Sequence, residues 1–398
     1  MDQTLGLYIH IPFCRSKCAY CDFYSLAGKE ARMDDYQRAL LAHLEESAPL
    51  ASSYTVDTIY FGGGTPSFYG DKRLVELLKC IRKKFNVDKQ AEISLEANPD
   101  SVDFKMLKHL RTAGFNRISL GVQSADNRIL SSLGRPHTFD QARQAVEWAR
   151  KAKFENLSLD LIYGLPGQTM EDWQNTVEQV LALNPEHISA YGLKVEEDTP
   201  LFHRVKQGET IPDDDMQADC YLWAADRLHQ AGYEQYEISN FAKPNRLSRH
   251  NYKYWMTQPY MGFGPGAHSD FGSRRYSFVR DLDGYISGVL GGGPIVDEDD
   301  EIPQKERSSE YLMLRLRTTH GIEEWEYRRK YLMNFTPIEE KLIEFETQGL
   351  ACRNGPRWHL TPKGFLLSNY IIGTLLELQE QATLADTLAR VTDKSNPI

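Results

Sequence analysis

The chain has 398 residues, 41% of them hydrophobic and 26% charged, with a net charge of −10. This length allows one large domain and at least one smaller domain. The acidic balance without a long basic run argues against a nucleic-acid-binding surface, and no apolar run approaches the ~18 residues of a membrane span. The three cysteines outside one loop lie far apart, which indicates a reducing compartment, and the N-terminus lacks a charged-then-apolar leader, so we expect a cytoplasmic protein.

Six short β-rich runs, each followed by a loop and a segment of helical periodicity, occupy the first part of the chain. The runs are 5–11, 58–61, 92–96, 117–122, 157–162 and 187–193, and the helical segments between them are 34–48, 72–85, 103–113, 139–152 and 170–183. Successive strand–helix units with right-handed crossovers form a parallel sheet that curls toward a barrel. We therefore expect an α/β fold with a partial (β/α)6 barrel, similar to a TIM barrel, over residues 1–233.

Three cysteines, Cys14, Cys18 and Cys21, follow the first predicted strand with the spacing C-x3-C-x2-C. Structural zinc normally takes four protein ligands, whereas an iron–sulfur cluster held by three cysteines leaves one iron open to a small molecule. A zinc site completed by His10 or by distant ligands is the alternative. Purely structural buried thiols usually occur singly, so the loop favours an open-coordinate cluster.

Polar residues follow the next strands, at the ends where barrel proteins build their sites. The segment 62–66 (GGGTP) follows the second strand, Glu96 ends the third, Gln123 follows the fourth and Asp160 lies within the fifth. A triple glycine lets a ligand approach the backbone closely. Gln and Asp side chains suit ribose hydroxyls, and Arg135 suits a carboxylate. A tight turn for the glycines and a capping or salt-bridging role for Glu96 are the alternatives.

The strand–helix pattern ends near residue 233. Residues 234–296 form an aromatic-rich extension, and three glycines followed by five consecutive acids at 297–301 indicate a solvated linker. The helices and hairpin expected within 297–378 are similar to a winged-helix module. Because no basic recognition helix stands out, we favour a packing or lid role over DNA binding. Residues 379–398 are polar, and we expect a frayed tail there.

Together these motifs resemble the radical S-adenosylmethionine (SAM) enzymes, in which a C-x3-C-x2-C loop holds a [4Fe–4S] cluster. The chain is most similar to the group that contains the oxygen-independent coproporphyrinogen III oxidases and the HemW haem chaperones. The matching segments are 8–14 (YIHIPFC), 62–67 (GGGTPS), 121–124 (GVQS) and 160–166 (DLIYGLP). The resemblance extends over residues 7–367, nearly the whole chain.

The resemblance implies a role for each matching position. Cys14, Cys18 and Cys21 would bind the cluster and leave its fourth iron for SAM. The SAM site would be lined by Tyr8, Gly63, Gly64, Thr65, Glu96, Gln123, Arg135 and Asp160, with Tyr20 packing near the cluster. In this family one electron from the reduced cluster splits SAM into methionine and a 5′-deoxyadenosyl radical, and the protein supplies geometry and a dry site.

Three features indicate which of the two branches of this group, the oxidases or the HemW chaperones, the chain resembles more. The oxidases carry a fourth cysteine two residues after the third, where this chain has Phe23, and they extend well upstream of the cluster. The segment 250–255 (HNYKYW) matches the HNxxYW motif that marks HemW. All three argue against the oxidase.

By its residue types, the HNxxYW motif suits a porphyrin. A neutral imidazole such as that of His250 is a good axial ligand for haem iron, and the neighbouring aromatic rings offer flat faces to a macrocycle. The residues alone equally allow a core aromatic cluster in which His250 only forms hydrogen bonds. Further candidate ligands are His268, His10 and, less favoured, Cys220.

We therefore expect a haem chaperone that binds haem and SAM, carries a [4Fe–4S] cluster, transfers haem to apo-haemoproteins and lacks coproporphyrinogen oxidase activity. A membrane-associated recipient and a haem-linked homodimer are compatible with this hypothesis. One alternative is a radical SAM oxidoreductase acting on a tetrapyrrole, such as a coproporphyrinogen III dehydrogenase. Another is a haem- or redox-sensing regulator.

Overall fold

The computed structural model describes the backbone of residues 3–393 and the side chains of residues 3–382. The chain forms two compact units. The barrel unit comprises Met1–Glu234, Ser239–Lys253 and Gln258–Glu301, and the C-terminal unit comprises Gln235–Ile238, Tyr254–Thr257 and Ile302–Ile398. Among the described residues, no helix has both the length and the apolar character that crossing a membrane requires.

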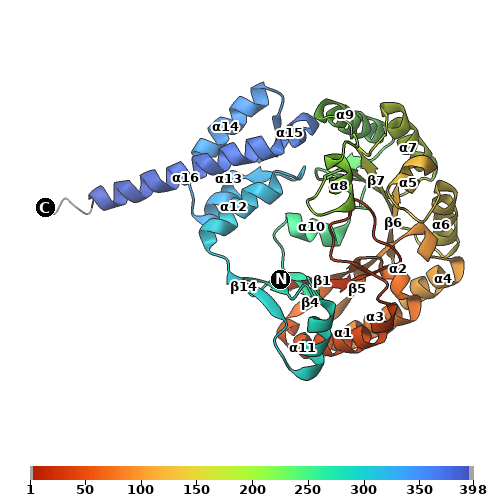
Figure 1. Cartoon of the computed structure of the whole chain (residues 1–398). Helices are drawn as coiled ribbons and strands as arrows, with labels where there is room; N and C mark the ends of the chain where they lie inside the picture. Colours follow the sequence, from red (N-terminus) through yellow and green to blue (C-terminus); the bar gives the residue numbers. More distant parts are fainter. Residues whose placement is uncertain (1–2, 394–398) are drawn as a thin grey trace. The chain divides into compact units, whose positions relative to one another are not determined.

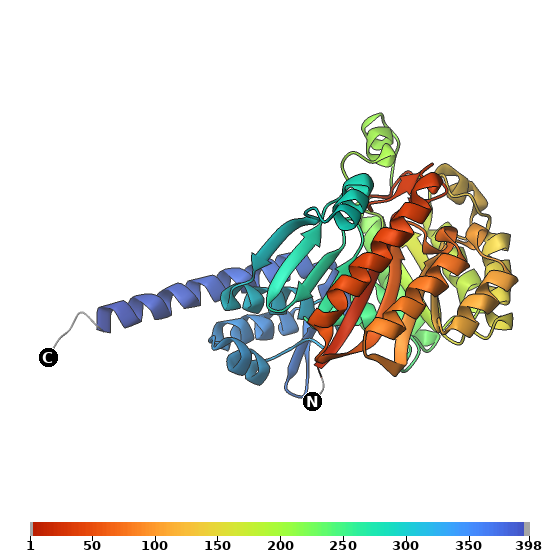
Figure 2. The same ribbon diagram turned by 90° about the horizontal axis from the view of Figure 1, so that it is seen from below.

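Six parallel strands form the centre of the barrel unit. They are β1 (Gln3–Ile11), β4 (Tyr54–Gly63), β5 (Val87–Ala97), β6 (Arg117–Gln123), β7 (Leu157–Tyr163) and β8 (His187–Gly192), adjacent in this order. The helices packed outside them are α1 (Met33–Ser47), α3 (Asp71–Lys84), α4 (Phe104–Ala113), α6 (Phe139–Lys151), α7 (Met170–Ala182) and α9 (Asp214–Gln230) (Figures 1 and 2). The predicted α/β fold with six strand–helix units is confirmed.

Shorter elements lie in the loops at both ends of this barrel. At the strand ends lie β2 (Phe13–Cys14), β3 (Leu26–Ala27), α2 (Pro66–Tyr69), α5 (Asn127–Ser132) and α8 (Pro200–Lys206). Short 3-10 helices occupy Glu30–Arg32, Ala48–Ala51 and Pro99–Ser101. Capping boxes explain where two long helices begin, because Thr138 and Thr169 each accept a hydrogen bond from the backbone N–H three residues later.

The aromatic-rich segment does not form a separate layer, because it lengthens the sheet at both edges. Its elements are β9 (Glu234–Gln235), β10 (Asn240–Ala242), α10 (Arg249–Trp255), β11 (Tyr260–Phe263), β12 (His268–Phe271), β13 (Arg274–Phe278) and α11 (Leu282–Gly291). Strand β10 pairs with β8 antiparallel, while β11 pairs with β1 in parallel. An open barrel leaves two unpaired edges, and these strands cover them.

The prediction of a solvated linker at residues 297–301 is wrong. Residues Val296–Glu301 form strand β14, which pairs antiparallel with β13. All six of its side chains are exposed, and Arg274 on β13 forms an ion pair with Asp299 at 2.7 Å. An edge strand whose side chains all face solvent needs no apolar pattern, and for this reason the run of acids conceals it.

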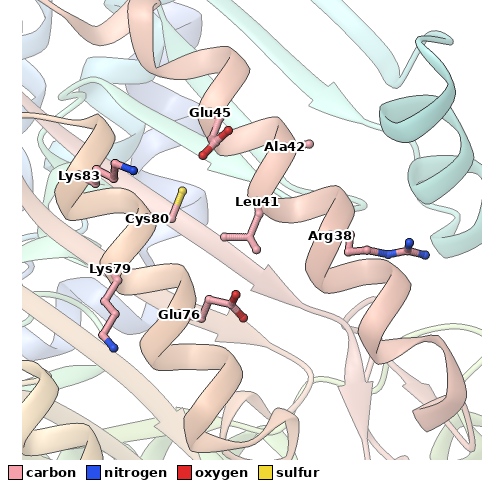
Figure 3. Close-up of a pocket in the computed structure, with 8 residues that line it drawn as sticks. All are labelled: Arg38, Leu41, Ala42, Glu45, Glu76, Lys79, Cys80 and Lys83. Carbon is pink, nitrogen blue, oxygen red and sulfur yellow. The ribbon is translucent and has the colours of Figure 1, made fainter.

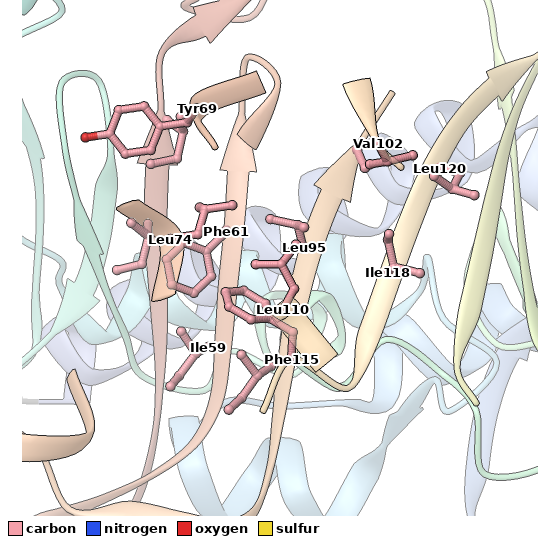
Figure 4. Packing of buried hydrophobic residues seen from close by; sticks show 14 of the residues in the cluster. Ile59, Phe61, Tyr69, Leu74, Leu95, Val102, Leu110, Phe115, Ile118 and Leu120 are labelled. Carbon is pink, nitrogen blue, oxygen red and sulfur yellow. The ribbon is translucent and has the colours of Figure 1, made fainter. Parts of the chain in front are cut away.

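The hydrophobic core of the barrel unit lies between the strands and the outer helices (Figure 4). On β1 the side chains of Leu5, Leu7 and Ile9 are fully buried in it. Phe61 on β4 packs against Phe115, with ring centroids 5.1 Å apart. Full burial of each such side chain stabilises the fold by roughly 2 kcal/mol before conformational entropy is counted.

The opposite face of the same strands is polar. Because side chains alternate along a strand, the residues between the core positions point into the barrel. The buried or half-buried polar residues at these positions are Thr58, Tyr60, Glu92, Ser94, Glu96, Arg117, Ser119, Ser158, Asp160, His187 and Ser189. The barrel interior is therefore built for hydrogen bonding.

The C-terminal unit contains helices followed by a hairpin. Its elements are α12 (Gln304–Arg315), β15 (Ile322–Glu323), α13 (Glu324–Tyr331), α14 (Thr336–Thr347), β16 (Ala351–Asn354), β17 (Arg357–Leu360), α15 (Pro362–Leu366) and α16 (Ser368–Asp393). Strands β16 and β17 form an antiparallel hairpin, and β15 pairs with β17. This arrangement is the winged-helix-like α+β architecture that the sequence predicts.

The frayed tail does not begin at residue 379. Helix α16 continues to Asp393, and the Gln379 side chain is 4% exposed and donates to Ser308 Oγ at 2.6 Å. Burial of this amide on α12 anchors the helix beyond the point where its sequence turns polar. Residues 394–398 of the predicted tail lie outside the described residues.

Candidate functional site

The cysteine loop lies where β1 ends. Cys14 is the last residue of β2, Cys18 is also buried, and Cys21 is half-buried. The backbone N–H of Cys21 donates to Cys18 O at 3.2 Å, while Ala19 donates to Leu133 O at 3.1 Å. These bonds tie the loop to itself and to the segment after α5.

The donor set fits a cluster better than a single ion. Burial raises the pKa of the Cys14 and Cys21 thiols, and the interactions among the three thiols show that they are neighbours. Within the described part of the chain, no group of three or more His, Cys, Asp or Glu side chains could hold one metal ion. The thiolates of a [4Fe–4S] cluster each bind a different iron and need not converge on one point.

His10 is not available to complete a zinc site. Its Nδ1 lies 3.0 Å from the Tyr8 hydroxyl and its Nε2 lies 2.9 Å from Tyr24 O. Burial lowers the pKa of His10 to about 4, so the ring is neutral at physiological pH. The geometry therefore does not support the zinc alternative that uses His10.

The glycine segment closes around the cysteine loop and leaves no room for side chains. A Cβ on Gly64 would lie 2.8 Å from Phe13 O and 3.0 Å from Cys14 Sγ, and one on Gly63 would lie 2.7 Å from the His10 ring. Gly63 also has φ +111°, a conformation that favours glycine. Thr65 Oγ1 donates to Cys14 Sγ at 3.4 Å. These glycines are required by a close approach, so they are more than a tight turn.

Glu96 is the penultimate residue of β5, and its carboxylate is held inside the barrel. Oε1 accepts a hydrogen bond from the Tyr60 hydroxyl at 2.8 Å, and Oε2 accepts one from the Gly63 N–H at 3.1 Å. Burial raises the pKa of Glu96 to about 7, although the Tyr60 hydrogen bond opposes the shift. A buried carboxylate that is costly to ionise alone is suited to a cationic partner.

Asp160 is surrounded by serine hydroxyls. Ser119 Oγ donates to Oδ2 at 2.8 Å, and Oδ1 accepts from Ser189 Oγ at 2.7 Å and Ser158 Oγ at 3.1 Å. The three serines lie on β6, β8 and β7. The carboxylate is fixed before any ligand arrives.

Arg135 joins the cysteine loop to the strand ends. Its Nη1 donates to Cys18 Sγ at 3.3 Å, and Nη2 donates to Asn98 Oδ1 at 2.8 Å and Gly121 O at 2.7 Å. The guanidinium Nε is buried without a hydrogen-bond partner among the described residues. This cation has a donor left for an anionic group.

Gln123 and Tyr20 complete the predicted set around this arginine. Gln123 is buried with φ +67°, at a bulge in the pairing of β6 with β7. A Cβ on Gly121 would lie 2.9 Å from Gln123 Nε2 and 3.1 Å from Arg135 Nη2, so the two side chains are neighbours. Burial raises the pKa of Tyr20, while Arg135 opposes that shift.

His250 lies deep in the barrel and is fully buried. Its Nδ1 lies 2.9 Å from Thr58 Oγ1, and its ring stacks on Tyr60 with centroids 5.2 Å apart and planes at 22°. Tyr8 stacks more distantly, at 6.5 Å and 27°. In this arrangement the imidazole is enclosed by Thr58, Tyr60 and the backbone at Gly6, so axial binding of haem would require the ring to leave its packed position.

The other candidate haem ligands differ in exposure. His268 on β12 is exposed, whereas His10 and Cys220 are buried. The structure therefore brings the predicted cluster and SAM residues to one end of the barrel, and of the candidate haem ligands it places His10 and His250 on the same tyrosine, Tyr8.

Two residues that contact the predicted site residues were not themselves predicted from the sequence. Tyr60 donates to Glu96, and Asn98 accepts from Arg135. Tyr60 had a detectable signal, because it alternates with Ile59 and Phe61 on a predicted strand and therefore points inward. For Asn98 the only signal in the sequence was its position directly after the end of the third strand.

A separate groove of about 520 Å³ lies between α1 and α3, away from the strand ends (Figure 3). It is lined by Arg38, Leu41, Ala42, Glu45, Glu76, Lys79, Cys80 and Lys83. It contains none of the predicted site residues and is open to solvent.

Comparisons with known proteins agree with this geometry. The model of the Radical SAM superfamily matches residues 8–180, and the model of the HemN C-terminal domain matches residues 302–367. The chain is 34% identical over 372 residues to Heme chaperone HemW of Bacillus subtilis, covering 93% of this chain and 98% of that protein. It is 36% identical over 379 residues to Heme chaperone HemW of Mycobacterium tuberculosis, covering 94% and 95%.

The solved structure of coproporphyrinogen III oxidase (HemN), a radical SAM enzyme from Escherichia coli, superposes with a TM-score of 0.81. It is 24% identical, with coverage of 94% of this chain and 90% of that one. At this identity the likeness shows the fold alone. The family within this fold is shown by the relatives that match over nearly their full length. The chain belongs to the radical SAM superfamily and, within it, to the family of proteins named Heme chaperone HemW.

Proposed function

We propose that this protein is a haem chaperone that binds haem and transfers it to apo-haemoproteins. The observation that carries the proposal is the match, at 34% and 36% identity over more than nine-tenths of the chain, to relatives named Heme chaperone HemW. We further propose that the working protein is cytoplasmic; a membrane-associated recipient and a haem-linked homodimer are compatible with this function.

The proposal includes a [4Fe–4S] cluster on Cys14, Cys18 and Cys21 and a SAM molecule beside it. The close approach of Gly64 to Cys14 Sγ and the bonds from Thr65 and Arg135 to two of the sulfurs support this cluster site. When bound and reduced, such a cluster supplies one electron to the sulfonium of SAM.

The side chains around the cluster would each hold one part of SAM. Arg135, with a buried Nε free to donate, suits the carboxylate of its methionine moiety. Glu96 suits the ammonium group, because a cation offsets the cost of ionising this buried acid. Asp160 suits the ribose hydroxyls, and Tyr8, Gly63, Thr65, Gln123 and Tyr20 would form the remaining walls.

Phe23 favours a chaperone over an oxidase. It stands where the oxidases have a fourth cysteine, and its side chain is 71% exposed. An exposed phenyl ring offers no ligand and no redox chemistry at that position. We therefore propose that the protein does not oxidise coproporphyrinogen III.

The exposed ring of His268 supports it as the axial ligand better than the buried rings of His250 and His10. An imidazole at the surface can bind haem iron and release it to a recipient without local unfolding. This property suits a protein that must give up its cargo.

A haem titration of anaerobically reconstituted protein, with and without SAM, tests the proposed function. We expect about four irons per chain, a Soret shift on haem addition that weakens in His268→Ala, and no conversion of coproporphyrinogen III. Absence of haem binding by the wild type would refute the chaperone function. Turnover of coproporphyrinogen III would instead establish the dehydrogenase, and salt-sensitive binding to a specific DNA site would establish a regulator.

A further inference from the structure

Helix α10, which carries the HNxxYW motif, is tied into the barrel by residues distant in sequence. The Glu92 carboxylate on β5 accepts hydrogen bonds from the backbone N–H groups of Arg249 at 3.2 Å and His250 at 3.1 Å. Asp57 on β4 forms ion pairs with Lys253 at 2.8 Å and with Arg249 at 3.4 Å. Lys253 is 3% exposed, so this anchor is buried. Two acids of neighbouring strands thus fix the start of the helix.

The anchor places the His250 ring in a tight space. The ring is fully buried, and a Cβ on Gly6 of β1 would lie 3.2 Å from His250 Cε1 and 3.2 Å from Lys253 Cδ. The Thr58 hydroxyl fixes the rotation of the ring through Nδ1. Burial and the nearby Lys253 lower the pKa of His250 to about 3, so the ring stays neutral.

The ring supports a side chain of the SAM site from behind. His250 stacks on Tyr60, and the hydroxyl of Tyr60 donates to Glu96. We propose that His250 is a positioning residue of the SAM site, which holds the Tyr60 ring so that its hydroxyl orients the Glu96 carboxylate. The proposal rests on the proposed SAM-binding role of Glu96, and it gives the HNxxYW motif a role inside the barrel.

The contacts run from His250 through Tyr60 to Glu96, and we call this series of contacts the relay. Glu96 is flanked by Tyr60 from β4, Tyr8 from β1, Arg117 from β6 and Asp160 from β7. Tyr60 donates a hydrogen bond to Glu96 and stacks on His250 at 5.2 Å, whereas Tyr8 stacks on His250 at 6.5 Å and its hydroxyl lies 3.0 Å from His10 Nδ1. Loss of the His250 ring would leave a space into which the Tyr60 ring can turn, and Glu96 would lose a hydrogen bond that favours its charged form.

A double-mutant cycle tests the relay. SAM affinity is measured for the reduced, reconstituted protein from the SAM-dependent change in the electron paramagnetic resonance spectrum of its cluster. The variants are His250→Ala, Tyr60→Phe and both together, with His229→Ala as the control because His229 is exposed on α9. Iron content and thermal unfolding of each variant report whether the cluster and fold survive.

We expect His250→Ala and Tyr60→Phe each to weaken SAM binding about tenfold, and the double variant to be no weaker than Tyr60→Phe alone. A packing defect unrelated to Tyr60 would instead add to its effect and would overturn the proposal. If His250→Ala fails to fold, Thr58→Val releases the ring more gently, and its expected loss of about threefold must also vanish in the Tyr60→Phe background.

Haem binding separates this inference from the proposed function. We expect His250→Ala to bind haem with the wild-type Soret shift while SAM affinity falls. Loss of the Soret shift with unchanged SAM affinity would make His250 a haem ligand and overturn the relay. If wild-type protein with an intact cluster binds no SAM, or if Glu96→Gln binds it normally, the proposed SAM site itself fails, and that outcome differs from a failure of His250 alone.

Discussion

The cysteine loop and the inner wall of the barrel, by which we mean the inward-facing polar side chains of its strands, meet at the same site. The loop is held mainly by backbone hydrogen bonds, whereas the inner wall is held by hydrogen bonds between side chains. The three thiols of the loop are held mainly by backbone bonds, with Thr65 and Arg135 donating to two sulfurs. On the inner wall, Glu96 and Asp160 are already held by hydroxyl donors from several strands. We therefore expect the loop to depend on the proposed cluster for its order, whereas the side chains of the inner wall already hold one another through hydrogen bonds.

Removal of a proposed cluster ligand is the largest expected change. Cys18→Ala should lose all cluster iron, about four per chain, together with any spectral response to SAM, while thermal unfolding shifts little because the wall remains intact. Iron analysis and the electron paramagnetic resonance spectrum of the reduced protein measure the effect. The matched control is Cys80→Ala on α3, which should keep its iron. An intact cluster in Cys18→Ala would contradict the ligand assignment.

A smaller change at the boundary between loop and wall is Gly64→Ala. Because the added Cβ would lie 2.8 Å from Phe13 O and 3.0 Å from Cys14 Sγ, strand β2 must shift, and we expect a destabilisation of about 1–3 kcal/mol and reduced iron retention. Denaturant unfolding and iron analysis check both. The control is Gly291→Ala, because a Cβ there meets no atom within 4 Å. Equal iron content in both variants would refute the close approach.

The wall itself is tested through the pH dependence of SAM binding. The pKa of Glu96 is raised from 4.5 to about 7, so ionisation of Glu96 reduces the stability of the free protein as pH rises through that window. SAM prefers the carboxylate, so its affinity should rise with pH toward 7, by up to about tenfold per unit. Glu96→Gln should bind more weakly above pH 7 and lose this dependence. A wild-type affinity that does not change between pH 6 and pH 8 would exclude Glu96.

The smallest expected effect is that of Arg15→Ala in the cysteine loop. Arg15 forms an ion pair with Asp100 at 3.0 Å, but its side chain is 56% exposed. The Asp100 side chain is only 6% exposed, so the pair is half-buried, but solvent around the arginine still limits its contribution to about 1 kcal/mol. Unfolding and iron content should therefore change little. A loss of cluster in this variant would mean that the loop is held by side-chain contacts after all.

Most of the fold follows from local patterns. The apolar run of β1 and the helical periodicity of α6 and α7 act over a few residues, so the sequence predicts these elements to within two residues at each end, whereas it finds only the central part of β4. The strands after residue 233 are exceptions. Among them β14 has acids that carry no apolar pattern, and its pairing with β13 depends on an edge that only the folded sheet provides.

The site divides in the same way. Cys14, Cys18, Cys21 and the glycine segment are recognisable because their spacing is local, and Glu96 and Asp160 because they lie on predicted strands. Contacts between distant segments were not predictable: Arg135 reaches Cys18 across 117 residues, and His250 reaches Thr58 across 192.

The sequence by itself determined the chemistry available to this protein: a three-cysteine loop, a close-approach glycine segment and polar strand ends on an α/β barrel. Only the tertiary structure decided where the HNxxYW motif lies. A sequence motif shows residue types but not burial, and the packing of α10 against Glu92 and Asp57 places the His250 ring inside the barrel behind Tyr60.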